Sequence, residues 1–347
     1  MPTSEPLRGR IQTVTGPIDP DDLGPTLMHE HLLWDIRRPD MRDDPDQGPE
    51  IDLCNCWRIN YGTLRSPNNY LLFDREIACE EVAHMRAAGG RAIVELTIGG
   101  LSPDPEGLAE IARATDTHIV MGCGHYVHDY QDPANRDRSV DDFAAEMIAQ
   151  IREGAWGTDI RAGILGEIGC QSPWTDQERR VMAGALVAQR ETGAALNVHP
   201  GRDPDQPQEV ADFVAAEGGD TSRLILSHID RTVFDDERLF RLADSGAVIE
   251  LDLFGQEQSH YSLNLKIDLP NDAERLRWMR RLIDRGHLEQ IAISHDICYR
   301  TRLRRFGGHG YGHIFENVVP LMRRRGFSET EIETILVVTP KRLLTFV

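Results

Sequence analysis

The stretch GILGEIGCQSPWTDQERRVMAGALVAQRETGAALNVH, residues 163–199, contains one complete unit of the predicted fold. Residues 163–168 and 195–199 are short apolar runs typical of buried strands. Between them, residues 176–192 have a helical pattern with apolar side chains on one face, those of Val181, Ala185, Leu186 and Ala188. Gly193 follows where a helix C-cap is expected. A strand, a helix and another strand in this order predict two parallel strands joined by a crossover helix.

The same alternation recurs along the chain. Apolar runs predict eight strands, at 26–33, 92–98, 118–123, 163–168, 195–199, 224–228, 248–253 and 291–297. Further helices are predicted at 207–217, 235–245 and 272–285. Eight such repeats indicate a parallel sheet closed on itself, so the expected fold is α/β, a single (β/α)8 TIM barrel. We expect one domain over 1–347, with 1–24 as an N-terminal extension that packs on the barrel.

Two segments are too long to be ordinary connections between a strand and the next helix. Residues 35–70, after the first predicted strand, are rich in Pro, Asp and Asn, and residues 254–270 follow the seventh. The loops that follow the strands build the active site of a β/α barrel. We therefore expect both long loops to lie near the barrel mouth and to shape a pocket, although surface decoration is an equal alternative for any single residue in them.

The composition narrows the class of protein. The formal net charge is −19, which argues against nucleic acid or an anionic membrane as a partner, since both need basic patches. No apolar run approaches the roughly 18 residues of a membrane helix, and MPTSEPLRGRIQTV lacks the apolar core of a secretory signal. The six cysteines have no metal-binding or redox spacing. We expect a cytoplasmic protein that acts on a small molecule.

His29-Glu30-His31 is the strongest local signal for a metal. Side chains at positions i and i+2 of a strand point the same way, so both imidazoles can converge on one ion from inside a barrel. This spacing differs from H-E-x-x-H, which needs a helix. Alone, the pair could also be two polar residues at a strand end. His295, next to Asp296, points the other way by the same parity and is not expected to be a ligand.

Other ligand-type residues stand at matching strand ends, and together they favour a metal centre. His199 and His228 close the fifth and sixth predicted strands, and Asp296 closes the eighth. Glu167 lies within an apolar strand, where an unpaired charge would be costly to bury. A metal removes that cost, and an ion pair with arginine is the alternative. Imidazole and carboxylate are the ligands that suit zinc and similar divalent ions.

Several stretches resemble the phosphotriesterase-like family of the amidohydrolase superfamily, and within it the phosphotriesterase-related (resiniferatoxin-binding-like) proteins. The matching segments are GPTLMHEHLLWD, GEIGC, NVHPGR, LSHIDRT, LDLFG, ISHDICYRTRLRRFGGHGYGHIFENVVPLMRRRG and VVTPKRLLTF. The resemblance implies a centre of two divalent ions, zinc first, with manganese or cobalt as alternatives. It assigns His29, His31 and Asp296 to the more buried ion, and His199 and His228 to the more exposed one. It also implies pairing into a homodimer.

The bridging ligand between the two ions is commonly a carboxylated lysine in this family, and here the matching position is Glu167. The only two lysines, Lys266 and Lys341, lie far downstream of it. A subgroup of relatives has glutamate in this place. Both groups present a bidentate carboxylate, so the resemblance implies that Glu167 bridges the ions.

The implied activity is hydrolysis, in which a metal-bridging hydroxide attacks an ester, lactone, phosphoester or amide of a small molecule. Asp296 is the expected catalytic proton acceptor and donor. Asp230 either serves the reaction, by orienting a ligand or passing the proton outward, or packs behind the site. Tyr126, after the third strand, and Arg300, in the loop after the eighth, are expected to contact substrate. The alternative function is a ligand-binding barrel with a structural metal and no turnover.

Overall fold

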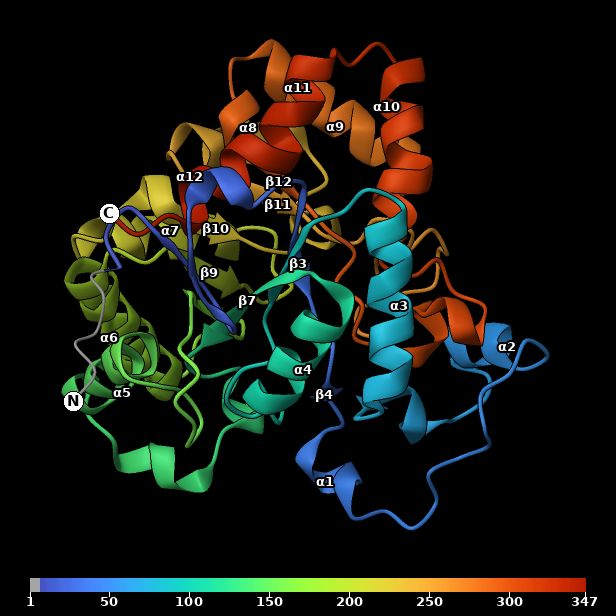
Figure 1. Cartoon of the computed structure of the whole chain (residues 1–347), viewed down its shortest axis with the longest axis horizontal. Coiled ribbons are helices and arrows are strands. Elements are labelled where there is room, and N and C mark those ends of the chain that lie inside the picture. The colour runs from blue at the N-terminus through green and yellow to red at the C-terminus, as the bar shows by residue number, and fades with distance from the viewer. Residues whose placement is uncertain (1–6) are drawn as a thin grey trace.

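The computed structural model describes residues 7–347 and has an eight-stranded parallel sheet at its centre, surrounded by helices (Figure 1). The strands are β3 (Thr26–Glu30), β6 (Ala92–Glu95), β7 (His118–Cys123), β8 (Ile164–Gly169), β9 (Leu196–His199), β10 (Leu224–Leu226), β11 (Val248–Leu251) and β12 (Ile291–Ile293). Each pairs with its neighbour in this order. The sheet closes where the Asp296 N–H donates to the His29 carbonyl at 3.2 Å and the Ile297 N–H donates to Glu30. The expected (β/α)8 TIM barrel is confirmed.

Helices follow the strands around the barrel. They are α3 (Arg75–Ala87), α4 (Pro105–Thr115), α5 (Val140–Arg152), α6 (Asp176–Thr192), α7 (Gln206–Ala216), α8 (Asp236–Asp244) and α9 (Asp272–Asp284), with α10 (Val319–Arg324), α11 (Glu329–Glu333) and α12 (Thr339–Leu344) after the last strand. Local sequence sets their ends. At α6, Thr175 and Glu178 form a reciprocal capping box, and Gly193 takes the left-handed conformation at φ +75° that closes the helix.

A packed cluster fills the inside of the barrel. Apolar side chains from the strands meet there, among them Met28, Val94, Val120, Ile164, Ile225, Val248 and Ala292. Ile11 and Leu23, from the segment before β3, belong to the same cluster. The hairpin of β1 (Ile11–Thr13) and β2 (Gly16–Ile18) attaches to the barrel through the Val14 N–H, which donates to the Ile119 carbonyl. Of the expected N-terminal extension, residues 1–6 lie outside the described part of the chain.

The sequence predicts several strands that are longer than the observed ones. Four of them were expected to reach residues 33, 228, 253 and 297, but the sheet pairing of these strands ends at Glu30, Leu226, Leu251 and Ile293. The backbone itself ends two of them, because His228 and Asp296 have φ +56° and +51°, a left-handed conformation incompatible with a strand. These two side chains therefore stand on turns directly above the sheet.

The long segment 35–70 is partly ordered into short elements. It contains α1 (Pro39–Arg42) and α2 (Cys56–Asn60), both outside the ring of barrel helices (Figure 1). The two-residue strands β4 (Trp34–Asp35) and β5 (Leu71–Leu72) pair across its ends. Its Tyr61 ring stacks on His260 of the second long segment at 5.7 Å between ring centroids. Among residues 7–347, no helix is long and apolar enough to cross a membrane.

Candidate metal centre

The six expected ligands come together at the C-terminal end of the barrel strands. They are His29, His31, Glu167, His199, His228 and Asp296. Their facing atoms form two groups that each lie within 4.8 Å: His29, His31 and Asp296 in one, and Glu167, His199 and His228 in the other. The family resemblance divides these residues between two ions along the same line, and that assignment stays a prediction.

The first group is formed by His29 of β3, by His31 directly after this strand, and by Asp296, which follows β12 where the barrel closes. Nε2 of His31 lies 3.3 Å from Oδ1 of Asp296, and Nε2 of His29 lies 3.8 Å from the same oxygen. His29 is fully buried, and its Nε2 has no hydrogen-bond partner in residues 7–347. Burying a ring nitrogen without a hydrogen-bond partner is costly unless a bound group that is not part of the protein satisfies it.

Glu167 connects the two groups. Its Oε1 lies 3.5 Å from Nε2 of His31. Its Oε2 lies 2.8 Å from Nδ1 of His199 and 3.2 Å from Nε2 of His228. No arginine pairs with this carboxylate in the described residues, so the ion-pair alternative is not what the structure contains. Oε2 also lies 3.6 Å from Nε2 of His29, so this carboxylate lies between the two groups of histidines, where a bridging carboxylate would lie.

Two β-bulges lie in the strands that carry His29 and Glu167, two of the candidate ligands. The pairing of β3 with β6 shifts between Leu27 and Glu30, and that of β8 with β9 shifts between Leu165 and Ile168. Bulges of this kind re-aim side chains next to active sites. The one in β8 depends on Gly166 at φ +107°, where a Cβ atom would lie 2.0 Å from the Asn197 carbonyl oxygen.

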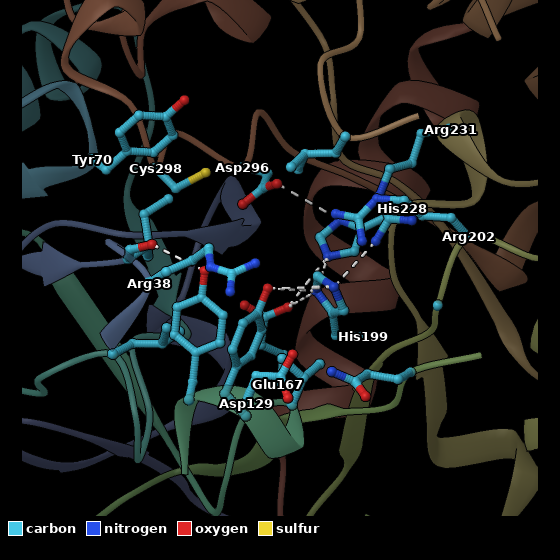
Figure 2. A pocket seen from close by; sticks show the side chains of 18 of the residues that line it. Arg38, Tyr70, Asp129, Glu167, His199, Arg202, His228, Arg231, Asp296 and Cys298 are labelled. Carbon is cyan, nitrogen blue, oxygen red and sulfur yellow. Dashed lines mark hydrogen bonds and ion pairs between the residues drawn. The ribbon is translucent and has the colours of Figure 1, made fainter. Parts of the chain in front are cut away.

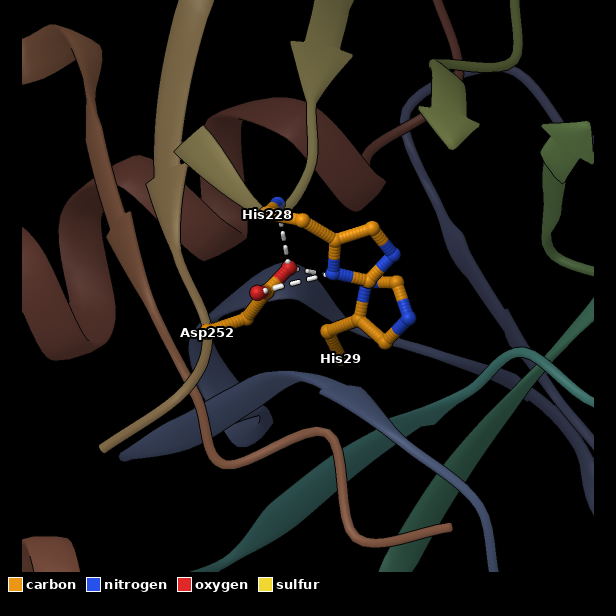
Figure 3. Close-up of side chains that lie close together, drawn as sticks. All are labelled: His29, His228 and Asp252. Atoms are coloured by element: carbon orange, nitrogen blue, oxygen red, sulfur yellow. Dashed lines mark hydrogen bonds and ion pairs between the residues drawn. The ribbon is translucent and has the colours of Figure 1, made fainter. Parts of the chain in front are cut away.

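Acidic side chains behind the histidines fix how the rings turn. Asp252 accepts hydrogen bonds from the backbone N–H and Nδ1 of His228, both at 2.9 Å, and lies 3.4 Å from Nδ1 of His29 (Figure 3). Glu250 lies 3.1 Å from the same His29 nitrogen. Because Nδ1 of His29 and Nδ1 of His228 face these carboxylates, both rings present Nε2 to the candidate metal centre. This arrangement is common for histidine ligands of metals.

Asp252 could also be read as a ligand, because its oxygen and Nδ1 of His29 and His228 form a third compact group. This third group uses Nδ1 of His29 and His228, whereas the first two groups use Nε2 of the same rings. A neutral imidazole presents one donor and one acceptor nitrogen, and Asp252 already accepts the His228 backbone N–H. The geometry therefore favours Asp252 as the orienting partner.

The electrostatics suit a bound cation. Burial lowers the pKa of His199 to about 4 with help from Arg231 and Arg202, although Glu167 opposes the shift. Burial and Arg231 likewise hold the pKa of His228 well below its usual value. Both rings are thus neutral at neutral pH, as ligands must be. At His29 burial is outweighed by Glu167, Glu250 and Asp252, which raise its pKa well above the usual value. Positive charge is favoured there.

A cavity of about 800 Å³ opens above the centre and is lined by both long segments and by the loops after the strands (Figure 2). Tyr126 lines it, with its hydroxyl 3.3 Å from Nε2 of His199. Arg300 does not line it; its Nε donates instead to the Leu71 carbonyl. Asp230, for which two roles were open, accepts from Arg275 at 2.7 Å and from the Leu253 N–H at 3.0 Å, and so packs behind the site.

Sequence reasoning missed three residues of the site: Glu250, Asp252 and Arg202. The first two had a detectable signal, because they stand at i and i+2 around an apolar residue in VIELDLFG, the same spacing that singled out His29 and His31. Arg202 lines the cavity shortly after His199. It stands in NVHPGR, where nothing in the sequence distinguishes it from the many other arginines.

Comparison with known proteins agrees with this geometry. Residues 9–344 match the model of the Phosphotriesterase family. An N-acetyltaurine hydrolase of Salmo salar is 39% identical over 98% of this chain and 99% of its own, and a phosphotriesterase-related protein of Nematostella vectensis is 36% identical over 97% and 99%. The crystal structure of a resiniferatoxin-binding protein from Rhodobacter sphaeroides superposes with a TM-score of 0.91 at 34% identity, covering 98% of this chain and 96% of that one. The expectation of a hydrolase is confirmed, and the chain belongs to the Phosphotriesterase family.

Proposed function

We propose that this protein is a hydrolase that holds two divalent metal ions. It cleaves the amide bond between the acyl group and the nitrogen of a small N-acylated compound. The observation that carries the proposal is the two groups of candidate ligands, with Glu167 in contact with both and the unpartnered Nε2 of His29 in one of them. The donor set of imidazoles and carboxylates suits zinc first, with manganese or cobalt as alternatives.

His29, His31 and Asp296 would hold one ion, His199 and His228 the other, and Glu167 both. When bound, the ions would bring the pKa of a water molecule toward neutrality and polarise the oxygen of the scissile carbonyl. The packed barrel interior closes the site from below, and the cavity gives substrate and water a route to these residues.

Asp296 is suited to move the proton. Its side chain is 15% exposed, whereas the His29 side chain is fully buried, so Asp296 faces the cavity as well as the centre. We assign it the transfer of a proton from the attacking water to the departing amine. Tyr126 is placed to hydrogen-bond the substrate. Burial and the nearby Glu167 raise its pKa well above the usual value, so at neutral pH its hydroxyl is a neutral donor.

The choice of an acyl substrate rests on the relatives. The hydrolase of Salmo salar, matched over almost all of both chains, is named for N-acetyltaurine. An amide of a small amine is therefore the first substrate class to test, ahead of lactones and phosphoesters.

The test is a turnover screen on protein whose metal content is measured by mass spectrometry. Wild-type protein loaded with zinc, manganese or cobalt is given N-acetyltaurine, N-acetyl amino acids, lactones and phosphoesters. We expect hydrolysis of an N-acyl compound with about two ions per chain, and its loss after chelation. Asp296→Asn should lower kcat by about a hundredfold or more while keeping most of the metal.

Asp212→Asn, an exposed change on α7, serves as the control and should have wild-type activity. The proposal fails if metal-loaded protein hydrolyses none of these compounds, which would favour the alternative of a ligand-binding barrel. It also fails if Asp296→Asn turns over at the wild-type rate.

A further inference from the structure

Arg202 reaches the cavity from the loop that follows β9. The backbone of this loop is held in place by Gln206, which is 2% exposed. The Gln206 side chain accepts from the Gly201 N–H and donates to the Gln171 carbonyl of the neighbouring loop. Gly201 allows this approach, since a Cβ there would lie 2.7 Å from the Ser172 nitrogen. The position of Arg202 is therefore set by the fold.

The guanidinium of Arg202 has no carboxylate partner in residues 7–347. Its Nε donates to the Tyr261 hydroxyl at 3.1 Å, and the group lies 5.8 Å from the centre of that ring. Neither Nη atom donates to the described protein. By contrast, the buried Arg275 pairs with Asp230 and Asp272 at 2.7 and 2.9 Å. A partly buried cation with free donors and no counter-ion is costly unless a ligand supplies the negative charge.

Other charged groups around the cavity are already satisfied or lie at its rim. Arg231 follows the next strand and lies on the same side (Figure 2), but it donates to the Pro200 carbonyl and Thr232 hydroxyl. Arg38 is exposed and pairs with the exposed Asp40 at 3.1 Å. Asp129, also lining the cavity, is exposed. Among the described arginines that line the cavity, Arg202 is the one that lies inside it with donors to spare.

Arg202 lies close to the groups assigned to the reaction. Its positive charge acts on both Tyr126 and His199, and all three line the same cavity. A small substrate whose scissile bond lies at the metal ligands can therefore extend its far end to this guanidinium.

We propose that Arg202 and the hydroxyl of Tyr261 bind an oxyanion, a sulfonate or a carboxylate, at the amine end of the substrate. This inference rests on the proposed acyl hydrolysis and narrows its substrates to N-acylated amino-sulfonates and amino acids. The two Nη groups of arginine form a planar fork that matches two oxygens of such a group. Tyr261 accepts from Nε and keeps its own proton, so it can donate to another oxygen.

Ligand binding tests the site independently of turnover. Propane-1-sulfonate, butanoate and the neutral methyl propyl sulfone are titrated into metal-loaded protein by NMR, with metal content checked in each sample. Wild type should bind one of the anions at least about tenfold more tightly than the sulfone, and the tighter anion identifies the oxyanion. Arg202→Gln should lose this preference, and Arg202→Lys should keep part of it. The exposed Arg277→Gln removes the same charge and should bind as wild type does.

Turnover gives the second measurement. Arg202→Gln should raise KM for N-acetyltaurine or N-acetyl-β-alanine by about tenfold or more, with a smaller change for the neutral N-propylacetamide. Equal losses for charged and neutral substrates would overturn the inference, as would unchanged anion binding in Arg202→Gln. If no N-acyl compound is hydrolysed but Arg202→Gln still abolishes anion binding, the proposed function fails and the anion site stands.

Discussion

The Asp252 carboxylate lies 2.9 Å from Nδ1 of His228, on the side of the ring opposite to Glu167. Because Nε2 of the same ring lies 3.2 Å from Glu167, the imidazole bridges a buried acid and the candidate metal centre. Asp252 also accepts the His228 backbone N–H, which holds a residue in the strained left-handed conformation. One carboxylate thus sets both the backbone and the ring of this ligand.

We predict that Asp252→Asn weakens metal binding by about 10- to 100-fold. The amide can still occupy the space, but its NH2 group can donate a hydrogen bond, so it no longer fixes which nitrogen of the His228 ring bears the proton. Competition with a chromogenic chelator measures the zinc affinity. Asp212→Asn is the control, and equal affinities in both variants would show that Asp252 does not orient His228.

Gly166→Ala should destabilise the fold strongly. The added Cβ would meet the Asn197 carbonyl at 2.0 Å, and the backbone has φ +107°. Gly157→Ala is a matched comparison, since Gly157 has φ +78° and no atom within 4 Å of a Cβ. We expect a loss of about 1 kcal/mol for Gly157→Ala and at least twice that for Gly166→Ala, measured by urea unfolding. Equal losses would mean that the bulge in β8 adapts freely.

Breaking the buried Asp230–Arg275 pair should also be costly. Both side chains are fully buried, and Arg275→Met leaves the Asp230 carboxyl group buried without its strongest partner. We predict a loss of about 3–5 kcal/mol in unfolding free energy. Arg277→Met, on the exposed face of the same helix, should change it by less than about 0.5 kcal/mol. Adding Asp230→Asn to Arg275→Met should recover part of the loss; full additivity of the two changes would argue against the pair.

A surface pair gives a prediction about pH. Hydrogen bonds from Arg280, at 2.7 and 3.1 Å, lower the pKa of Glu331 to about 2 from its usual 4.5. A lowered folded-state pKa means stability that is present above pH 4.5 and is lost as the pH falls toward 2. The pair is solvent-screened, so its contribution is under about 1 kcal/mol. Urea midpoints of wild type and Glu331→Gln should differ at pH 7, and the difference should shrink as the pH is lowered from 4.5 toward 2. A constant difference would contradict this.

The sequence was sufficient for the barrel because each strand and helix carries its own periodic pattern. Residues 176–192 were predicted as a helix and observed as α6 with the same ends, since a capping box and a glycine mark them locally. The candidate ligands could be singled out because histidine and carboxylate are rare at the ends of apolar runs. Strand ends were less accurate, because the left-handed turns at His228 and Asp296 have no local sequence signature.

The substrate side of the site could not be predicted in the same way. The sequence predicted that Arg300, in the loop after β12, contacts the substrate, but its Nε donates a hydrogen bond to the Leu71 carbonyl. Arg202 emerges only from the packing of the loop after β9 against Gln171 and Tyr261, which lie far from it in sequence. Tertiary contacts decide which arginine has free hydrogen-bond donors, and these contacts cannot be inferred from the composition.

The bridging position of Glu167 is tested most directly by anomalous diffraction at the zinc edge from crystals of the zinc-loaded protein. We predict two peaks roughly 3.5–4 Å apart, one among His29, His31 and Asp296 and the other at His199 and His228, with one oxygen of Glu167 at each. A single peak would contradict the binuclear centre, and so would a peak between Asp252 and Nδ1 of His29 and His228.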